Sequence, residues 1–143
     1  MKKFIKRTIC FTFISFCFLK TDQVKSLVPY YYFPTIKNLQ KESLSISKSA
    51  YQLLYFGQYK ESINLAKLAV KLNNTDEKIW LILAEAQVAN KQYFNALNSL
   101  NQAQTINSNI SDIYFAKSNV YLKISQLKNA KAALEKGLKI EPN

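Results

Sequence analysis

The 143-residue sequence has no histidine and contains only two cysteines, two glycines and three prolines. The lack of histidine removes the commonest general base and the commonest metal ligand. Cys10 and Cys17 lie in one apolar N-terminal run and form neither a Cys-x-x-Cys metal motif nor a disulfide framework. Acidic residues are scattered singly, and there is no glycine-rich phosphate loop. We therefore expect no enzymatic activity, no metal and no cofactor.

The length and composition fit one ordinary domain with many lysines. Hydrophobic residues make up 48% of the chain, which is enough for a core, and the low glycine and proline content argues against a loop-rich β protein. The formal net charge of +11 indicates a negatively charged neighbour: an anionic membrane surface, an acidic partner or nucleic acid. Nucleic acid is disfavoured because the chain has a single arginine and no known binding motif. A soluble, lysine-rich surface is the simplest alternative.

Residues 1–26 have the pattern of a signal peptide or a short membrane anchor. Positive charges precede an uncharged run from Thr8 to Leu19, which is short for a spanning helix and fits a signal peptide. A helix that packs on the domain or lies in the membrane interface is a third reading. Residues 27–42 follow as a linker with an aromatic cluster between Pro29 and Pro34, and we expect it to lie on or near the first repeat or at a membrane interface.

From residue 43 onward the sequence repeats with a period of 34 residues in units 43–76, 77–110 and 111–143. Large residues recur at the fourth position and small residues at positions eight, twenty and twenty-seven. This pattern resembles the tetratricopeptide repeat, a helix–turn–helix unit. It predicts an all-α fold of six antiparallel helices in a short superhelical solenoid. The expected helices are near 43–56, 59–72, 77–90, 93–106, 111–124 and 127–140.

Individual residues support these boundaries, and a few depart from the repeat pattern. Gly57 suits the end of a first helix, Ser111 suits a helix start, and Pro142 disfavours continuation of the last helix. The main departures are Gln87 and Lys117, where the repeat pattern has apolar residues.

The resemblance implies an interaction scaffold in which the first helix of each repeat lines a concave groove. Its groove positions carried over to this chain give a partner-binding set of Tyr51, Tyr55, Lys78, Leu81, Glu85, Phe115, Asn119 and Lys123. Ser47 and Tyr51 stand where relatives that bind C-terminal carboxylates have lysine and asparagine, so carboxylate capture is disfavoured. The groove suits a helix or extended peptide with apolar anchors, or residues 27–42 folded back onto it.

Residues 49–93 also resemble a narrower family: small tetratricopeptide proteins of plastids and cyanobacteria that assist photosystem I assembly. The short length and a composition typical of A/T-rich genomes agree with this family. The resemblance implies a plastid thylakoid membrane location and photosystem I subunits or assembly factors as partners. A bacterial envelope scaffold exported to the periplasm is the alternative.

Overall fold

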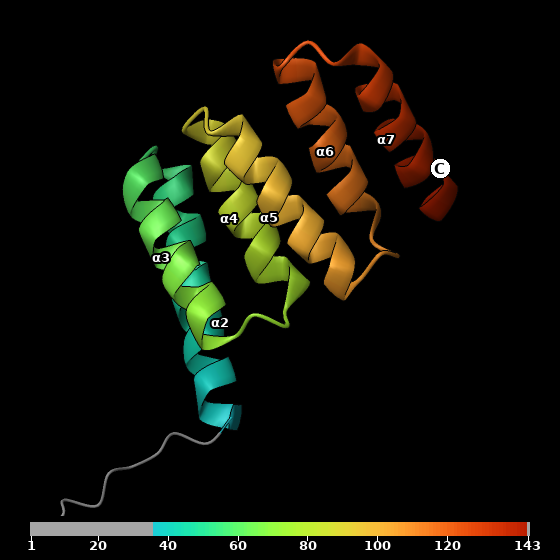
Figure 1. Ribbon diagram of the computed structural model, residues 1–143. Coiled ribbons are helices and arrows are strands. Elements are labelled where there is room, and N and C mark those ends of the chain that lie inside the picture. The colour runs from blue at the N-terminus through green and yellow to red at the C-terminus, as the bar shows by residue number, and fades with distance from the viewer. Residues whose placement is uncertain (1–35, 143) are drawn as a thin grey trace, which may run out of the picture. The chain divides into compact units, whose positions relative to one another are not determined.

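The computed structural model describes residues 36–142, which form six α-helices and no strand (Figure 1). Contacts divide the chain into two units, Met1–Phe33 and Pro34–Asn143, and all described residues belong to the second. The helices are α2 (Ile36–Tyr55), α3 (Tyr59–Leu72), α4 (Glu77–Ala89), α5 (Tyr93–Ile106), α6 (Ser111–Lys123) and α7 (Leu127–Ile140). The expectations for residues 1–26, and for residues 27–35 of the predicted linker, lie outside the described residues.

The observed helices confirm the predicted all-α repeat architecture, and the largest difference is the length of the first helix. The second helix of each repeat has the predicted bounds, and α2, α4 and α6 each end one residue earlier than predicted. The prediction that the first helix begins near residue 43 is wrong, because α2 begins at Ile36. Proline restricts the residue that precedes it far more than those that follow, so Pro34 leaves the next residues free to start a helix.

Each repeat is a helical hairpin whose two helices approach closely at small residues. Ala50, Ala84 and Ala96 are buried at these crossings. Two hydroxyl groups join the pairs: Ser62 Oγ donates to the Ala50 carbonyl at 2.7 Å, and Ser118 Oγ donates to the Ala130 carbonyl at 2.9 Å. The serine is on the second helix in repeat one and on the first helix in repeat three. Close packing therefore needs a small side chain at both positions, and a buried hydroxyl is tolerated because a carbonyl accepts from it.

The turns inside the three repeats share one backbone conformation. Gly57, Lys91 and Ser125 have φ of 76°, 59° and 59°, respectively, and stand 34 residues apart. Each turn closes with paired backbone hydrogen bonds, such as those from Gln92 N to Gln87 O and from Lys91 N to Val88 O. This pattern ends a helix with one residue in the left-handed region, where glycine is preferred. The prediction for Gly57 is confirmed.

The loops between repeats are held by hydrogen bonds from aromatic side chains. Trp80 Nε1 donates to the Asn74 carbonyl at 3.0 Å, and Tyr114 Oη donates to the Ser108 carbonyl at 3.0 Å. The large residue at the fourth position of a repeat thus holds the loop that precedes it.

In the last repeat, a hydrogen bond joins the first residue of α6 to the residue that follows α7. Ser111 was expected to cap α6, but Ile110 occupies the N-cap and Ser111 is the first helical residue. The Ser111 hydroxyl instead donates to Glu141 Oε2 at 2.6 Å, which ties the start of α6 to the end of α7. Helix α7 ends at Ile140, as the proline at 142 predicts. Between residues 36 and 142, no helix combines the length and apolarity needed to cross a membrane.

Candidate functional site: a groove between the second and third repeats

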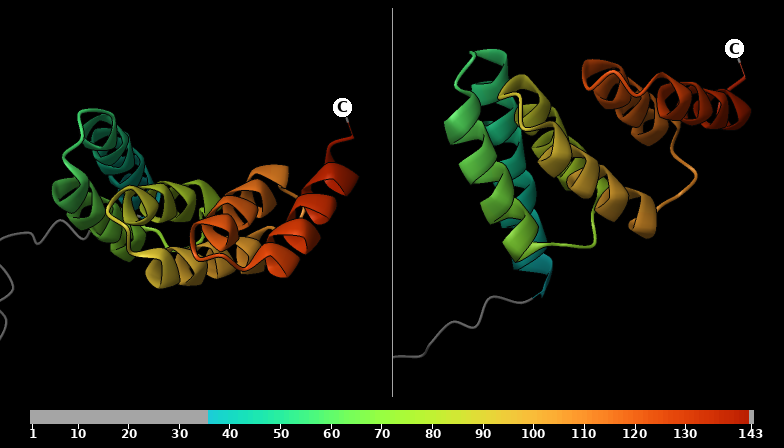
Figure 2. Two further views of the ribbon diagram at one scale, coloured as in Figure 1. Left: turned by 90° about the horizontal axis from the view of Figure 1, so that it is seen from above. Right: turned by 45° about the horizontal axis from the view of Figure 1, so that its top comes forward.

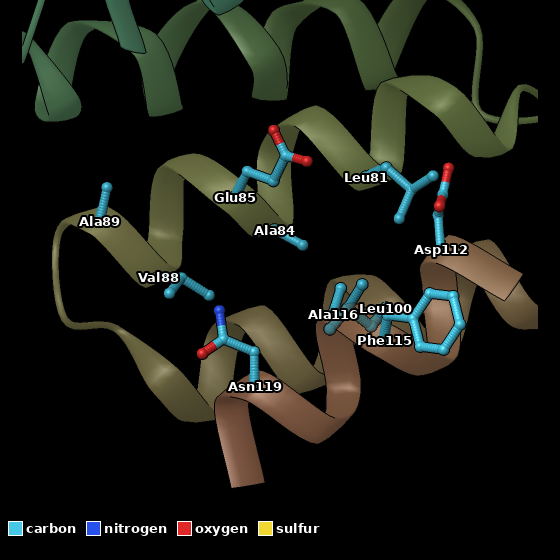
Figure 3. Close-up of a pocket in the computed structure, with 10 residues that line it drawn as sticks. All are labelled: Leu81, Ala84, Glu85, Val88, Ala89, Leu100, Asp112, Phe115, Ala116 and Asn119. Carbon is cyan, nitrogen blue, oxygen red and sulfur yellow. The ribbon is translucent and has the colours of Figure 1, made fainter. Parts of the chain in front are cut away.

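A groove of about 640 Å³ lies between α4 and α6, with a residue of α5 at its base (Figure 3). The lining side chains come from the first helices of repeats two and three and from Leu100, and most are apolar. They are Leu81, Ala84, Glu85, Val88, Ala89, Leu100, Asp112, Phe115, Ala116 and Asn119. The groove is therefore an apolar channel with two carboxylates and one amide.

The groove wall formed by α6 depends on the packing of α7 behind it. A Cβ atom at Gly137 would lie 2.6 Å from Cε1 of the Phe115 ring, closer than packed atoms approach. Glycine at this position lets Phe115 rest directly on the α7 backbone. Leu100 and Val120 are fully buried beneath the groove. The position of Phe115 is thus set by a residue on a helix that does not line the groove.

The charge in the groove is negative. Partial enclosure by the groove walls raises the pKa of Glu85, and the negative charge of Asp112 raises it further. Among the ten residues that line the groove there is no lysine or arginine. A ligand segment with a positive charge beside apolar side chains would neutralise this carboxylate pair, whereas an acidic segment would be repelled.

The structure brings together four of the eight residues predicted to bind a partner: Leu81, Glu85, Phe115 and Asn119. The other four do not line this groove. Tyr51 and Tyr55 belong to α2, in the first repeat, and Tyr55 is the last residue of that helix. Lys123 is the last residue of α6.

Lys78 lies in a separate depression near the start of α2, together with Gln40, Lys41 and Leu44. Ser47, which the repeat pattern also placed in the groove, is buried, and its hydroxyl donates to the Leu44 carbonyl at 2.9 Å. Sequence reasoning did not place Leu100 and Ala116 in the groove, because their repeat positions predict packing between helices. Leu100 is fully buried at the base of the groove, and Ala116 is partly exposed in its wall.

A second, smaller pocket of about 180 Å³ lies against α5, α6 and α7 and contains a buried lysine. Lys117 is only 8% exposed, and its ammonium group donates to Gln104 Oε1. Desolvation lowers the pKa of Lys117, and the positive charge of Lys136 lowers it further. The repeat pattern has leucine here, as at Leu83 in repeat two. Lys117 is therefore a charged residue at a core position where the repeat pattern has leucine.

Comparison with known proteins supports the fold. Residues 111–143 match the family model of the tetratricopeptide repeat. The tetratricopeptide domain of OM64 from Arabidopsis has 18% identity and a TM-score of 0.70 over 73% of this chain and 87% of its own. The second such domain of Spaghetti (RPAP3), bound to the HSP90 peptide SRMEEVD, has 17% identity and a TM-score of 0.68 over 71% and 94%.

The type III secretion chaperone SycD of Yersinia enterocolitica, in complex with a peptide of the translocator YopD, shows the same similarity of fold. It has 18% identity and a TM-score of 0.67 over 69% of this chain and 76% of its own. No curated protein sequence matches the chain. The chain therefore has the fold of tetratricopeptide-repeat domains, and its third repeat matches that family by sequence.

Proposed function

We propose that this protein is a non-catalytic interaction scaffold whose groove between α4 and α6 binds one segment of a partner protein. The observation that carries the proposal is the groove itself, with apolar walls and the carboxylates of Glu85 and Asp112. Apolar anchors in a desolvated centre dominate the affinity of such interfaces, while charges around them select the partner. The segment that fits best has apolar anchor side chains beside a lysine or arginine.

Two structural relatives support a peptide ligand for this fold, although their ligands differ. Spaghetti is solved with an HSP90 peptide that contains three acidic residues, and SycD with a peptide of its translocator. The negative charge of the present groove disfavours the first kind of ligand. This agrees with the sequence-based prediction that the chain does not capture an acidic C-terminal tail.

A pull-down from solubilised membranes of the source organism, with the full-length chain as bait, tests the groove. Glu85→Lys is expected to lose the bound partner, because it reverses the charge at the groove wall. The matched control is Glu42→Lys, which makes the same change on α2 outside the groove. Phe115→Ala should also weaken capture, and Tyr51→Ala should not. Equal recovery with all four variants would show that the groove is not the binding site.

For the partner and location we propose photosystem I subunits or assembly factors at the plastid thylakoid membrane. The support is the resemblance of residues 49–93 and the A/T-rich composition. Photosystem I subunits should co-purify with the wild type, and the complex should accumulate poorly in a deletion strain. Normal accumulation without co-purification would contradict this proposal while leaving the groove proposal intact. Recovery of the protein from a bacterial periplasm would favour the envelope scaffold instead.

A further inference from the structure

The three turns inside the repeats lie along the same edge of the helical unit, at the top of Figure 1 and in the right-hand view of Figure 2. We call this the hairpin edge and define it as residues 52–62, 86–96 and 120–130. The loops between repeats, with the start of α2 and the end of α7, lie at the opposite ends of the helices. We call this the loop edge and define it as residues 36–42, 70–80, 104–114 and 138–142.

The hairpin edge carries most of the strongly exposed large apolar side chains. Tyr55 is 83% exposed, Phe56 and Phe94 are each 72% exposed, and Leu127 is 70% exposed. Tyr55 and Phe56 contact each other edge to face, with ring centroids 5.7 Å apart, so this contact leaves both rings exposed to solvent. In the described residues, Ile36 alone has comparable exposure elsewhere. Every one of the three turns therefore presents at least one large apolar group.

The two edges also differ in charge. The hairpin edge contains four lysines against a single acid, Glu61, and the lysines Lys60, Lys91, Lys123 and Lys128 are all exposed. The loop edge contains five lysines and five acids. The hairpin edge therefore carries both the exposed apolar side chains and an excess of positive charge. Neither feature is needed for the hairpin turns themselves, which are closed by backbone hydrogen bonds.

From this coincidence we infer that the hairpin edge is a membrane-contacting surface that inserts its aromatic and aliphatic tips into the interface of an anionic bilayer. Aromatic rings favour the headgroup region, and lysines beside them gain from the negative potential of anionic lipid. Scattered exposed apolar residues are ordinary on protein surfaces, but a row of them interspersed with lysines matches the chemistry of an interfacial surface. The groove between α4 and α6 would then be held close to the bilayer.

Position-specific fluorescence in the full-length chain tests the contact. The chain has one tryptophan, Trp80, which is at the loop edge. Phe94→Trp in a Trp80→Phe background moves the single indole to the hairpin edge, where side-chain exposure makes the substitution benign. On vesicles of phosphatidylcholine and phosphatidylglycerol with brominated acyl chains, this indole should shift to the blue and be quenched several-fold more than Trp80 in the unaltered chain. The comparison is independent of any attachment through residues 1–35.

Removal of matched lysines tests the role of charge. The triple variant Lys60→Gln/Lys91→Gln/Lys128→Gln should lose most of the quenching at position 94. The triple variant Lys37→Gln/Lys71→Gln/Lys139→Gln removes the same charge from the loop edge and should retain it. Vesicles of phosphatidylcholine alone should give little quenching in any variant. The inference is overturned if the indole at position 94 emits as in water while the chain is vesicle-bound, if Trp80 is quenched equally, or if both triples behave alike.

Discussion

The two junctions between repeats differ in how they are packed. At the first junction, between repeats one and two, Ile63, Ala66, Leu83 and Ala86 form a buried apolar cluster with Ala50. At the second junction, between repeats two and three, Ala84, Ala96, Leu100 and Val120 form a buried apolar cluster, but a buried lysine, Lys117, also lies there and donates to Gln104. The concave groove also lies at the second junction. The more polar junction is thus the one where the solenoid leaves room for a partner.

The difference has a physical reason in one repeat position. Leu83 and Lys117 stand 34 residues apart and are both buried. Leucine fills its space with dispersion contacts and needs no partner. A lysine in the same place needs a hydrogen-bond acceptor for its buried ammonium group, and Gln104 provides it. The first two predictions that follow test this contrast, and the other two concern the turns inside the repeats and the groove.

The largest effect is expected from Leu83→Ala at the first junction. Removal of a buried leucine side chain should lower the free energy of unfolding by about 3 kcal/mol, through lost apolar burial and the cavity that remains. Urea denaturation followed by circular dichroism measures this. Leu68→Ala, at a partly exposed position of α3, is the control and should cost well under half as much. A loss at Leu83 as small as that at Leu68 would show that the first junction is not tightly packed.

Lys117→Met is expected to act in the opposite direction at the second junction. It replaces a desolvated ammonium group by an apolar chain of similar length, and should raise the free energy of unfolding by about 1 kcal/mol at neutral pH. Because the pKa of Lys117 is lowered in the folded state, the unfolded chain binds the extra proton and the wild type gains stability as pH rises toward 10.5.

The advantage of the Lys117→Met variant should therefore shrink on the alkaline side, as thermal melts over a pH series would reveal. Lys136→Met, which removes the neighbouring exposed lysine, is the control for loss of charge alone. If Lys117→Met destabilises the protein at neutral pH, the hydrogen bond between Lys117 and Gln104 stabilises the folded state by more than the desolvation of the ammonium group destabilises it.

Ser125→Gly should stabilise the third repeat by about 0.5 kcal/mol, because serine at φ of 59° is strained where glycine is not. The first repeat already has glycine at the equivalent Gly57, so Gly57→Ser should give a loss of similar size. Thermal unfolding of both variants measures the pair. Opposite signs for the two changes are the expected result, and a loss in both would mean that serine is favoured in the third turn by contacts of its side chain.

The smallest effect is expected from Glu85→Gln in the groove. The raised pKa of Glu85 means that the folded state disfavours the charged carboxylate, so stability from this residue is lost as pH rises from 4.5 through the folded-state pKa. The glutamine variant should show a flatter dependence of melting temperature on pH between mildly acidic and neutral conditions. Glu42→Gln serves as the control outside the groove. An unchanged pH profile would show that Glu85 is as well solvated as in the unfolded chain.

Several of these features were predictable from the sequence because they depend on local residues. Tyr59, Tyr93 and Leu127 begin the second helices as the repeat spacing predicts, since small residues recur at each crossing and a left-handed residue closes each turn. Leu81, Glu85, Phe115 and Asn119 were placed in the groove by the same register. The repeat register, which begins at residue 43, did not predict the start of α2 at Ile36, because the residues before the first unit lie outside the repeating pattern.

Other features depend on how repeats pack, and no single repeat contains that information. The repeat spacing placed Tyr55 and Lys123 at groove positions, but it does not determine the distance between adjacent helices. In the structure Tyr55 and Lys123 are the last residues of α2 and α6, beside the turns. Gly137 determines the position of Phe115 from another helix, and Lys117 is buried because α5 and α7 cover it. The order and period of the residues determined the helices and their pairing, since those depend on neighbours along the chain. The tertiary structure decided which side chains meet, because the distance between repeats depends on the volume and charge of residues far apart in sequence.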